Sequence, residues 1–206
     1  MERPLKVTAG FDVDDVFYPL NEHVSAIAGI DYGDIVTFHT MDNPRLDADQ
    51  KRRLYAAYQT PGLHADMDFY PGAREFGVLA RDPRLDPWIC SNSLDQVIVD
   101  NKIRNLSAFL EDDWALFRQM FNIVTMDGSR EKRFPPDLYL LFDDSPLNAV
   151  ASGARHVIMP VRPWSTSGWA KDVMSGILDR VEYYECPEEA CAIARRILDD
   201  ELGHIG

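Results

Sequence analysis

Five short apolar segments alternate with amphipathic segments along the chain. Each apolar segment is bounded by polar residues, proline or glycine, which predicts buried strands. These segments are residues 5–13, 87–91, 120–126, 138–143 and 155–161. Apolar residues at helical spacing predict helices over residues 72–82, 93–110 and 187–202. The alternation predicts an α/β fold, with a doubly wound, Rossmann-like parallel sheet of about five strands.

The connection after the first predicted strand is too long for a structureless loop. Residues 18–70 contain two helical patterns, at 21–30 and 46–59, and are rich in aromatic residues. We therefore expect a small helical cap over residues 18–70. The core domain would then consist of residues 1–17 and 71–206.

The composition is that of a folded protein with an acidic surface. Of the 206 residues, 46% are hydrophobic, and the net charge is −13, which disfavours binding to a nucleic acid polymer. The three cysteines lack CxxC spacing, which argues against a disulfide framework or a zinc site. No segment is apolar and long enough for a signal peptide or a membrane span, so we expect a cytoplasmic protein without membrane contact.

Acidic residues collect at the ends of two predicted strands. The first strand ends in FDVDD, with Asp12, Asp14 and Asp15, and the fourth ends in LFDD, with Asp143 and Asp144. Ligands of open parallel sheets bind outside these carboxyl ends. Buried like charges are costly unless a cation or a proton neutralises them, and a set of oxygen ligands suits Mg²⁺. The sequence therefore predicts an Mg²⁺ site made by Asp12, Asp14, Asp143 and Asp144, with a solvated turn as the alternative.

Neutral and basic residues at the neighbouring strand ends suit a phosphate group. The second strand ends in ICSNS, where Ser91 and Asn92 offer donors beside the N–H groups of a helix expected to begin near Ser93. Lys132, after the third strand, offers a positive charge. The alternatives are a capping serine and a solvated loop lysine.

These motifs, in this order, resemble those of the haloacid dehalogenase-like phosphatase superfamily. DVDDV at 12–16 is similar to its first motif, DxDx[TV], and ICSNS is similar to the second. A lysine provides the third motif, and DDSPLN at 143–148 is similar to the fourth. Residues 61–80, with WICSN and LLFDDSPLN, are similar to the 5'(3')-deoxyribonucleotidases, the cytosolic type C nucleotidases.

The resemblance implies an Mg²⁺ cofactor and a reaction through an aspartyl-phosphate on Asp12. It implies that Asp14 is the general acid and base, with its backbone carbonyl at the metal. Dehalogenases of the superfamily lack the acid at the position of Asp14, so its presence favours a phosphate ester as substrate. The other implied roles are the metal site for Asp143 and Asp144, and the phosphoryl site for Ser91 and Lys132.

Two features depart from the family pattern or leave a choice open. Many family members have glycine where this chain has Asp15, whose role the sequence leaves unexplained. Lys102, in the helix after the second motif, also reaches the phosphate region and is an alternative to Lys132.

The aromatic residues of the predicted cap raise the question of base recognition. Phe17 and Tyr18 are candidates for binding the substrate by stacking on a nucleobase, although aromatic residues of a small helical unit more often form its core. His39 and His64 are interpreted as structural or exposed rather than catalytic.

The leading hypothesis is an Mg²⁺-dependent phosphatase of nucleoside monophosphates, resembling a 5'-deoxyribonucleotidase. One alternative is a phosphatase for another small ester, such as a sugar phosphate. Another is a phospho-aspartate switch or binding protein without turnover, against which the insert at 18–70 argues. A homodimer is compatible with the sequence, which does not by itself indicate an oligomeric state.

Overall fold

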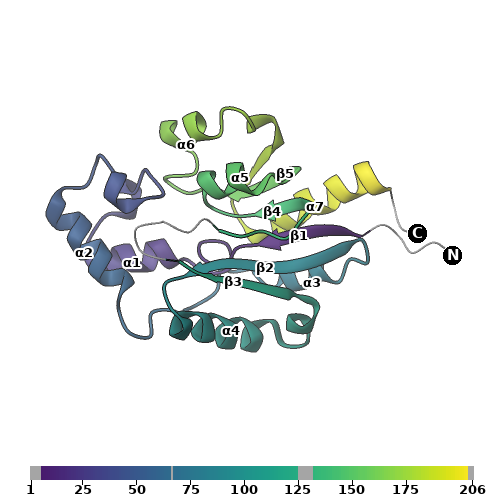
Figure 1. The fold of residues 1–206 in the computed structure, drawn as a ribbon, viewed down its shortest axis with the longest axis horizontal. Coiled ribbons are helices and arrows are strands. Elements are labelled where there is room, and N and C mark those ends of the chain that lie inside the picture. The colour runs from purple at the N-terminus through teal and green to yellow at the C-terminus, as the bar shows by residue number, and fades with distance from the viewer. Residues whose placement is uncertain (1–5, 66, 125–131, 204–206) are drawn as a thin grey trace.

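The strands of this chain form one parallel sheet in the computed structural model, which describes residues 6–65, 67–124 and 132–203 (Figure 1). Within these residues the sheet has six strands in the order β3-β2-β1-β4-β5-β6, and all neighbouring strands pair in parallel. The strands are β1 (Val7–Phe11), β2 (Leu85–Ser93), β3 (Arg118–Ile123), β4 (Leu138–Phe142), β5 (His156–Pro160) and β6 (Val181–Tyr184). The predicted α/β fold with a doubly wound sheet is confirmed.

The edge strand β6 is the one that the hydrophobic pattern does not predict. Its four residues, VEYY, lie at the edge of the sheet, and all but Tyr184 are only half-buried. An edge strand this short carries too few apolar positions to stand out from a loop.

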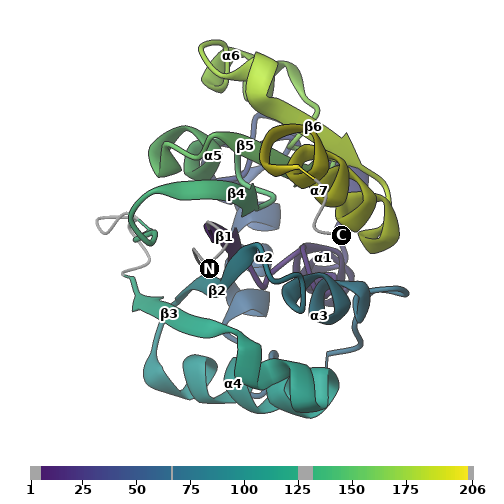
Figure 2. The ribbon, with the colours of Figure 1, turned by 90° about the vertical axis from the view of Figure 1, so that its right-hand side faces the viewer.

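Helices cover both faces of the sheet (Figure 2). The larger apolar cluster includes side chains from three helices, α3 (Glu75–Ala80), α4 (Gln96–Leu110) and α7 (Pro187–Leu202). Of these, α3 packs against α7. The helices α5 (Pro146–Ser152) and α6 (Gly168–Val173) belong to a second cluster with Leu138 and Leu141 of β4. The central strands are therefore buried on both faces, which explains their nearly continuous apolar sequences.

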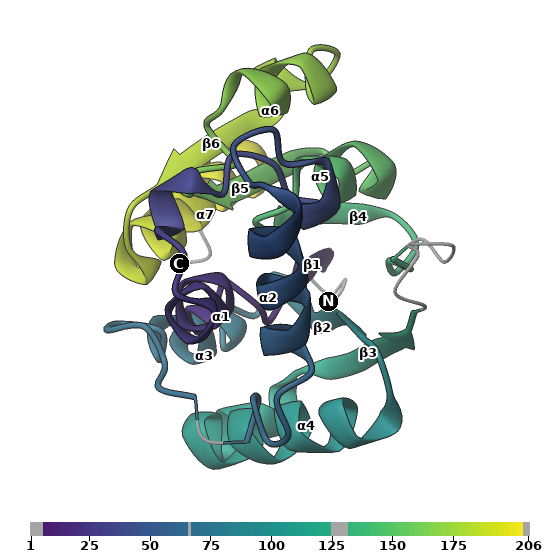
Figure 3. The same ribbon diagram turned by 90° about the vertical axis from the view of Figure 1, so that its left-hand side faces the viewer.

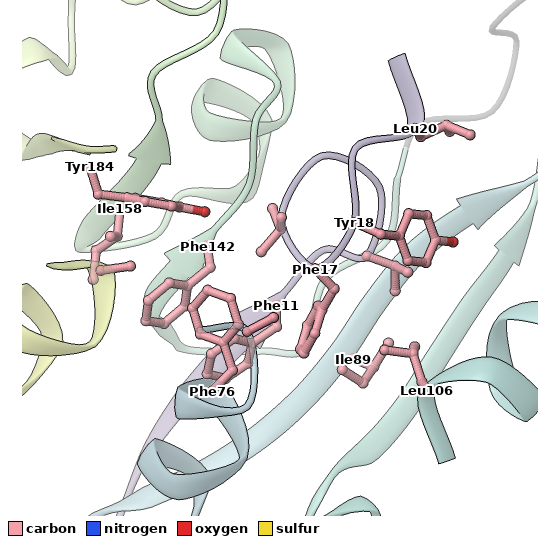
Figure 4. Close-up of a cluster of buried hydrophobic side chains, with 14 of the residues drawn as sticks. Phe11, Phe17, Tyr18, Leu20, Phe76, Ile89, Leu106, Phe142, Ile158 and Tyr184 are labelled. Atoms are coloured by element: carbon pink, nitrogen blue, oxygen red, sulfur yellow. The ribbon is translucent and has the colours of Figure 1, made fainter. Parts of the chain in front are cut away.

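Aromatic rings fill the core directly beneath the carboxyl ends of β1 and β4. The ring of Phe11 stacks on Phe142 with centroids 4.3 Å apart, and its edge meets Phe76 of α3 at 5.8 Å (Figure 4). Each fully buried phenylalanine contributes roughly 1.5–3 kcal/mol of transfer free energy. This packing fixes the two strand ends that carry the acidic motifs.

The predicted cap segment lies beyond the carboxyl ends of the strands (Figures 1 and 3). It contains α1 (Leu20–Ala28) and α2 (Ala48–Tyr58), which pack against each other, and two short 3-10 turns between them. A capping box of Asp47 and Gln50 begins α2. The N–H of Tyr70 donates to the carbonyl of Phe17 at 2.9 Å, so the segment leaves and re-enters the sheet domain at adjacent points.

None of the helices within the described residues is long and apolar enough to cross a membrane.

Candidate active site

The ends of β1 and β4 bring three carboxylates together. The N–H of Asp12 donates to the carbonyl of Phe142 at 2.8 Å, which continues the pairing of the two strands to the first acidic residue. One oxygen each from Asp12, Asp143 and Asp144 lies within 4.8 Å of the others, and all three residues are buried. The carboxylate of Asp14 does not join this group and faces Lys102 instead, and its predicted contact with the metal, through the backbone carbonyl, stays a prediction.

Lys132 lies between two of these carboxylates. Its Nζ is 2.8 Å from Asp12 Oδ2 and 2.6 Å from Asp143 Oδ2. Asp143 also accepts hydrogen bonds from the N–H of Ser145 at 2.9 Å and from the amide of Asn148 at 3.0 Å. Burial alone would lower the pKa of the Lys132 ammonium, but Asp12 and Asp143 outweigh it and raise that pKa. Most of the predicted loop before Lys132 lies outside the described residues.

Lys102 takes a separate place in the same site. Its Nζ donates to Asp14 Oδ2 at 2.6 Å, to Ser91 Oγ at 3.1 Å and to the carbonyl of Asn92 at 2.8 Å. The side chain is only 1% exposed. The two lysines considered for the third motif therefore both reach the site, with Lys132 beside Asp12 and Lys102 beside Asp14.

His64 lies beside Asp14. The interpretation of His64 as a structural or exposed residue did not predict this contact. The residue is 6% exposed, and its Nδ1 is 3.1 Å from the hydroxyl of Tyr18 and 3.7 Å from Asp14 Oδ1. Burial lowers the pKa of His64 to about 4, so the imidazole is neutral at pH 7. No local sequence signal marks this contact, because residues 12–18 and 64 meet only when the chain returns from the insert.

The rings of Phe17 and Tyr18 are not available for stacking on a base. Both residues have no exposed surface. Phe17 packs against Phe76 with centroids 5.0 Å apart (Figure 4). The ring of Tyr18 meets that of Phe69 with centroids 5.8 Å apart. The stacking hypothesis is therefore replaced by a core role for Phe17 and by a hydrogen bond to His64 for Tyr18.

The helix after the second motif begins at Gln96 rather than near Ser93. Ser93 still belongs to β2 and pairs with Ile123, and the N-cap is Asp95, whose carboxylate accepts from the N–H of Ile98 at 2.9 Å. The Asp95 carboxylate occupies the N–H of Ile98 and places a negative charge at the helix start, which disfavours phosphate binding by the N–H groups there. The buried Ser91 hydroxyl and its neighbour Lys102 remain as donors from this region.

The electrostatics of the carboxylate cluster suit a divalent cation. Burial, together with the charges of Asp143 and Asp14, raises the pKa of Asp12 to about 6 against the opposing charge of Lys132. Burial and the neighbouring carboxylates raise the pKa of Asp144 well above its ordinary value. Asp144 Oδ2 is buried and has no hydrogen-bond partner among the described residues. A hard cation would satisfy this oxygen and neutralise the cluster, so the donor set fits Mg²⁺.

Asp14 is electrostatically different from Asp12. Burial raises its pKa, but the charge and the hydrogen bond of Lys102 outweigh burial, and the pKa is lowered from the ordinary value. Asp14 is therefore ionised at pH 7 in this arrangement.

Asp15 faces the insert instead of the cluster. Its backbone is left-handed, with φ of 57°, a conformation that glycine favours and aspartate tolerates. Its buried carboxylate accepts from the amide of Asn21 at 2.6 Å, and the hydroxyl of Tyr58 donates to Asn21 Oδ1. Arg162 donates to the Asp15 carbonyl at 2.8 Å. The acid that the motif leaves unexplained thus joins the first strand end to α1 and α2.

This chain of contacts is expected to behave as one energetic unit. Tyr58→Phe should lower the free energy of unfolding by about 1 kcal/mol, because it removes one hydrogen bond. Glycine at position 15 keeps the left-handed backbone. In the Asp15→Gly background, the loss of unfolding free energy caused by Tyr58→Phe should be smaller than in the wild type by at least about 0.5 kcal/mol. Urea denaturation of the two single variants and the double variant measures this coupling.

The matched control is Tyr55→Phe, because Tyr55 also lies on α2 but is 41% exposed. The changes in unfolding free energy caused by Tyr55→Phe and by Asp15→Gly should be additive in the double variant. Equal costs of Tyr58→Phe in the two backgrounds would show that Asp15 is not coupled to α2.

Solved structures share this fold over nearly the whole chain. A protein assigned as a β-phosphoglucomutase from Thermotoga maritima is 17% identical, with a TM-score of 0.53, over 93% of this chain and 100% of that chain. A haloacid dehalogenase-like family hydrolase from Xanthomonas campestris is 16% identical, with a TM-score of 0.51, over 97% and 99%. A protein assigned as a HAD hydrolase from Bacillus subtilis, solved with magnesium bound, is 16% identical, with a TM-score of 0.51, over 93% and 99%.

No protein-family model matches the sequence, and no curated protein matches it. At these low identities the similarity concerns architecture rather than substrate. The chain has the fold of the haloacid dehalogenase-like hydrolases.

Proposed function

We propose that this chain is an Mg²⁺-dependent phosphatase of small phosphate monoesters, with nucleoside 5'-monophosphates, above all 5'-deoxyribonucleotides, as its substrates. The observation that carries the proposal is that the two acids of the first motif, Asp12 and Asp14, are each paired with a different lysine. Asp12 is held by Lys132 beside Asp143 and Asp144, while Asp14 is held by Lys102. One acid is thus placed to attack and the other to move a proton.

Asp12 is the proposed nucleophile. Lys132 and the N–H of Val13, which donates to Asp12 Oδ1 at 2.7 Å, fix the direction of its carboxylate. A carboxylate oxygen of Asp12 attacks phosphorus, and the bond between phosphorus and the ester oxygen breaks. Asp12, Asp143 and Asp144 would hold Mg²⁺, which supplies positive charge to the phosphate oxygens.

Asp14 is the proposed general acid and base. Substrate phosphate brings negative charge next to Asp14 and competes for Lys102, and both effects raise the pKa of Asp14 so that it takes up a proton. Asp14 gives this proton to the departing ester oxygen. Its carboxylate then accepts a proton from the water that attacks the aspartyl-phosphate, which frees Asp12 and inorganic phosphate.

Ser91 and Lys102 form the other side of the proposed phosphoryl site. The hydroxyl of Ser91 is buried 3.1 Å from Lys102 Nζ, so a donor and a positive charge lie together at the end of β2. Preorganised groups of this kind stabilise charge in the transition state without reorganising. The choice of nucleotides rests on the resemblance of residues 61–80 to deoxyribonucleotidases. The choice of Mg²⁺ is supported by the acid cluster and by the neighbour solved with magnesium.

Release of inorganic phosphate tests the proposal. The purified chain should hydrolyse deoxynucleoside monophosphates with Mg²⁺, and EDTA should lower the rate by at least about 10²-fold, with recovery when Mg²⁺ is restored. The panel includes ribonucleotides, sugar phosphates and p-nitrophenyl phosphate. Faster hydrolysis of sugar phosphates would replace the nucleotide assignment. A stable phospho-aspartate without phosphate release would favour the switch alternative.

A further inference from the structure

A crevice of about 350 Å³ lies between the segment that follows α2 and the start of α4. This volume is at the lower end of the range for small-molecule sites, which have volumes of roughly 300–1,000 Å³. Figure 3 shows the two segments passing each other beyond the carboxyl ends of the strands. The amide of Asn105 on α4 donates to the carbonyl of Met67 at 3.3 Å and ties the returning segment to the helix.

The crevice adjoins the proposed proton donor. His64 forms part of its wall and is 3.7 Å from Asp14 Oδ1, and Leu94 follows directly after β2, which carries Ser91. The proton from Asp14 must reach the ester oxygen, so the alcohol part of the substrate leaves from this side. The crevice is the cavity on the His64 side of Asp14, and a second cavity, lined in part by Val16, Tyr70 and Arg162, lies on the side of Asp15.

The walls of the crevice combine apolar side chains, among them Leu63, Leu94 and Ile98, with polar ones, and they carry little charge. Among the described residues that line it, the charged side chain is Asp95, and none is lysine or arginine. The neutral polar lining residues are Tyr58, Gln59, Thr60, His64 and Asn101. Nδ1 of His64 contacts Tyr18, and its Nε2 has no partner among the described residues, so one ring nitrogen is left for a ligand.

Both lysines of the site are already committed to partners within the protein. Lys132 contacts Asp12 and Asp143, and Lys102 contacts Asp14, Ser91 and the carbonyl of Asn92. Both lysines face the position of the reacting phosphate, and the crevice offers no cation for a second one. A second phosphate placed there would meet the carboxylate of Asp95 instead.

We propose that this crevice holds the alcohol part of the substrate and selects against charge, so that the enzyme accepts esters with a single phosphate on an uncharged, hydrogen-bonding alcohol. A nucleoside or a neutral sugar meets this description. Bisphosphates and esters with a carboxylate do not. The inference rests on the proposed phosphatase activity and adds Asp95 as a residue that determines specificity by repulsion.

Matched pairs of substrates test the inference. Each pair is a monophosphate and the same molecule with a second phosphate: deoxyadenosine 5'-monophosphate against the 3',5'-bisphosphate, and glucose 6-phosphate against glucose 1,6-bisphosphate. The quantity measured is the ratio of kcat/KM for the bisphosphate to that for the monophosphate. The wild-type ratio should be below about 0.1, and should rise with ionic strength because salt screens exposed charges.

Two substitutions change the charge of the crevice without enlarging it. Asp95→Asn keeps a good N-cap, and Val97→Lys adds a cation at a side chain that is 66% exposed. Together they should raise the bisphosphate to monophosphate ratio about tenfold. The control is Val150→Lys, at a valine on α5 that is 45% exposed and lies outside the crevice, which should leave the ratio unchanged.

The outcomes separate this inference from the function on which it rests. Hydrolysis of p-nitrophenyl phosphate with ratios that neither substitution moves would overturn the inference and leave the phosphatase assignment standing. A steric rather than electrostatic exclusion would give that result, because asparagine has the size of aspartate. Failure to hydrolyse any ester would overturn both.

Discussion

Replacing Asp12 with asparagine is expected to lower the rate of phosphate-ester hydrolysis by at least about 10⁴-fold while the chain still folds. An amide oxygen cannot form the aspartyl-phosphate, so the reaction loses its first step. The fold should tolerate the change, because burial makes the charged form of Asp12 unfavourable and Lys132 keeps its contact with Asp143. Phosphate release and urea denaturation measure the two effects.

The expected free energy of unfolding of the Asp12→Asn chain follows from the direction in which folding shifts the pKa of Asp12. The pKa of Asp12 is raised to about 6 in the folded chain, so the folded state binds more protons than the unfolded state between about pH 4 and 6. This residue therefore lowers stability as the pH rises through that window, and the neutral asparagine removes the effect. The Asp12→Asn chain should be at least as stable as the wild type at pH 7 without metal.

The matched control is Asp172→Asn, at an exposed position on α6. It makes the same chemical change far from the site and should leave the rate within a factor of two of wild type, since surface substitutions have small effects. If the Asp12→Asn chain kept more than about 1% of the wild-type rate, Asp12 would not be the nucleophile.

Replacing Lys132 with methionine is expected to lower the free energy of unfolding by about 3–5 kcal/mol in the absence of metal. The change leaves Asp12 and Asp143 buried together without the cation that lies 2.8 Å and 2.6 Å from them. The midpoint of urea denaturation at constant m-value measures the loss. Lys171→Met, at an exposed position on α6, is the control and should change stability by less than about 1 kcal/mol.

The pH dependence identifies the cause of this loss. Without Lys132, Asp12 loses the positive charge that opposes the effect of its burial. Asp12 then takes up a proton more readily in the folded chain than in the unfolded chain, so folding is favoured at lower pH. The loss should therefore be larger at pH 8 than at pH 5. A loss below about 1 kcal/mol at pH 8, or one that does not depend on pH, would show that the lysine does not neutralise the cluster.

The fold and the acid cluster could be predicted because their signals are local. Strands buried on both faces leave nearly continuous apolar segments, and the residues that follow them necessarily lie at one edge of a parallel sheet. Asp12, Asp143 and Asp144 therefore meet as the pattern predicts. Lys132 lies between Asp12 and Asp143 and Lys102 lies beside Asp14, so the assignment of the third motif to Lys132 stays a prediction.

The remaining parts of the site depend on contacts that no local pattern encodes. His64 reaches Asp14 only because the segment after α2 runs beside α4. Phe17 is buried in the core, where its ring packs against Phe76, and is therefore not available to a substrate. The start of α4 could not be chosen from the sequence, since both Ser93 and Asp95 are good N-cap residues. Pairing of Ser93 with Ile123 extends β2 and leaves the cap to Asp95.

Strands β1 and β4 lie side by side in the sheet although more than half of the chain separates them in the sequence. Closing a loop of that length is slow, and it must precede any contact between Asp12 and Asp143. Asp12 stays apart from Asp143 and Asp144 until β4 pairs with β1, so neither an unfolded chain nor a fragment ending before β4 can gather the three carboxylates. A cation site made by these three carboxylates would therefore require the pairing of β1 with β4, and ion binding would report that this pairing is complete.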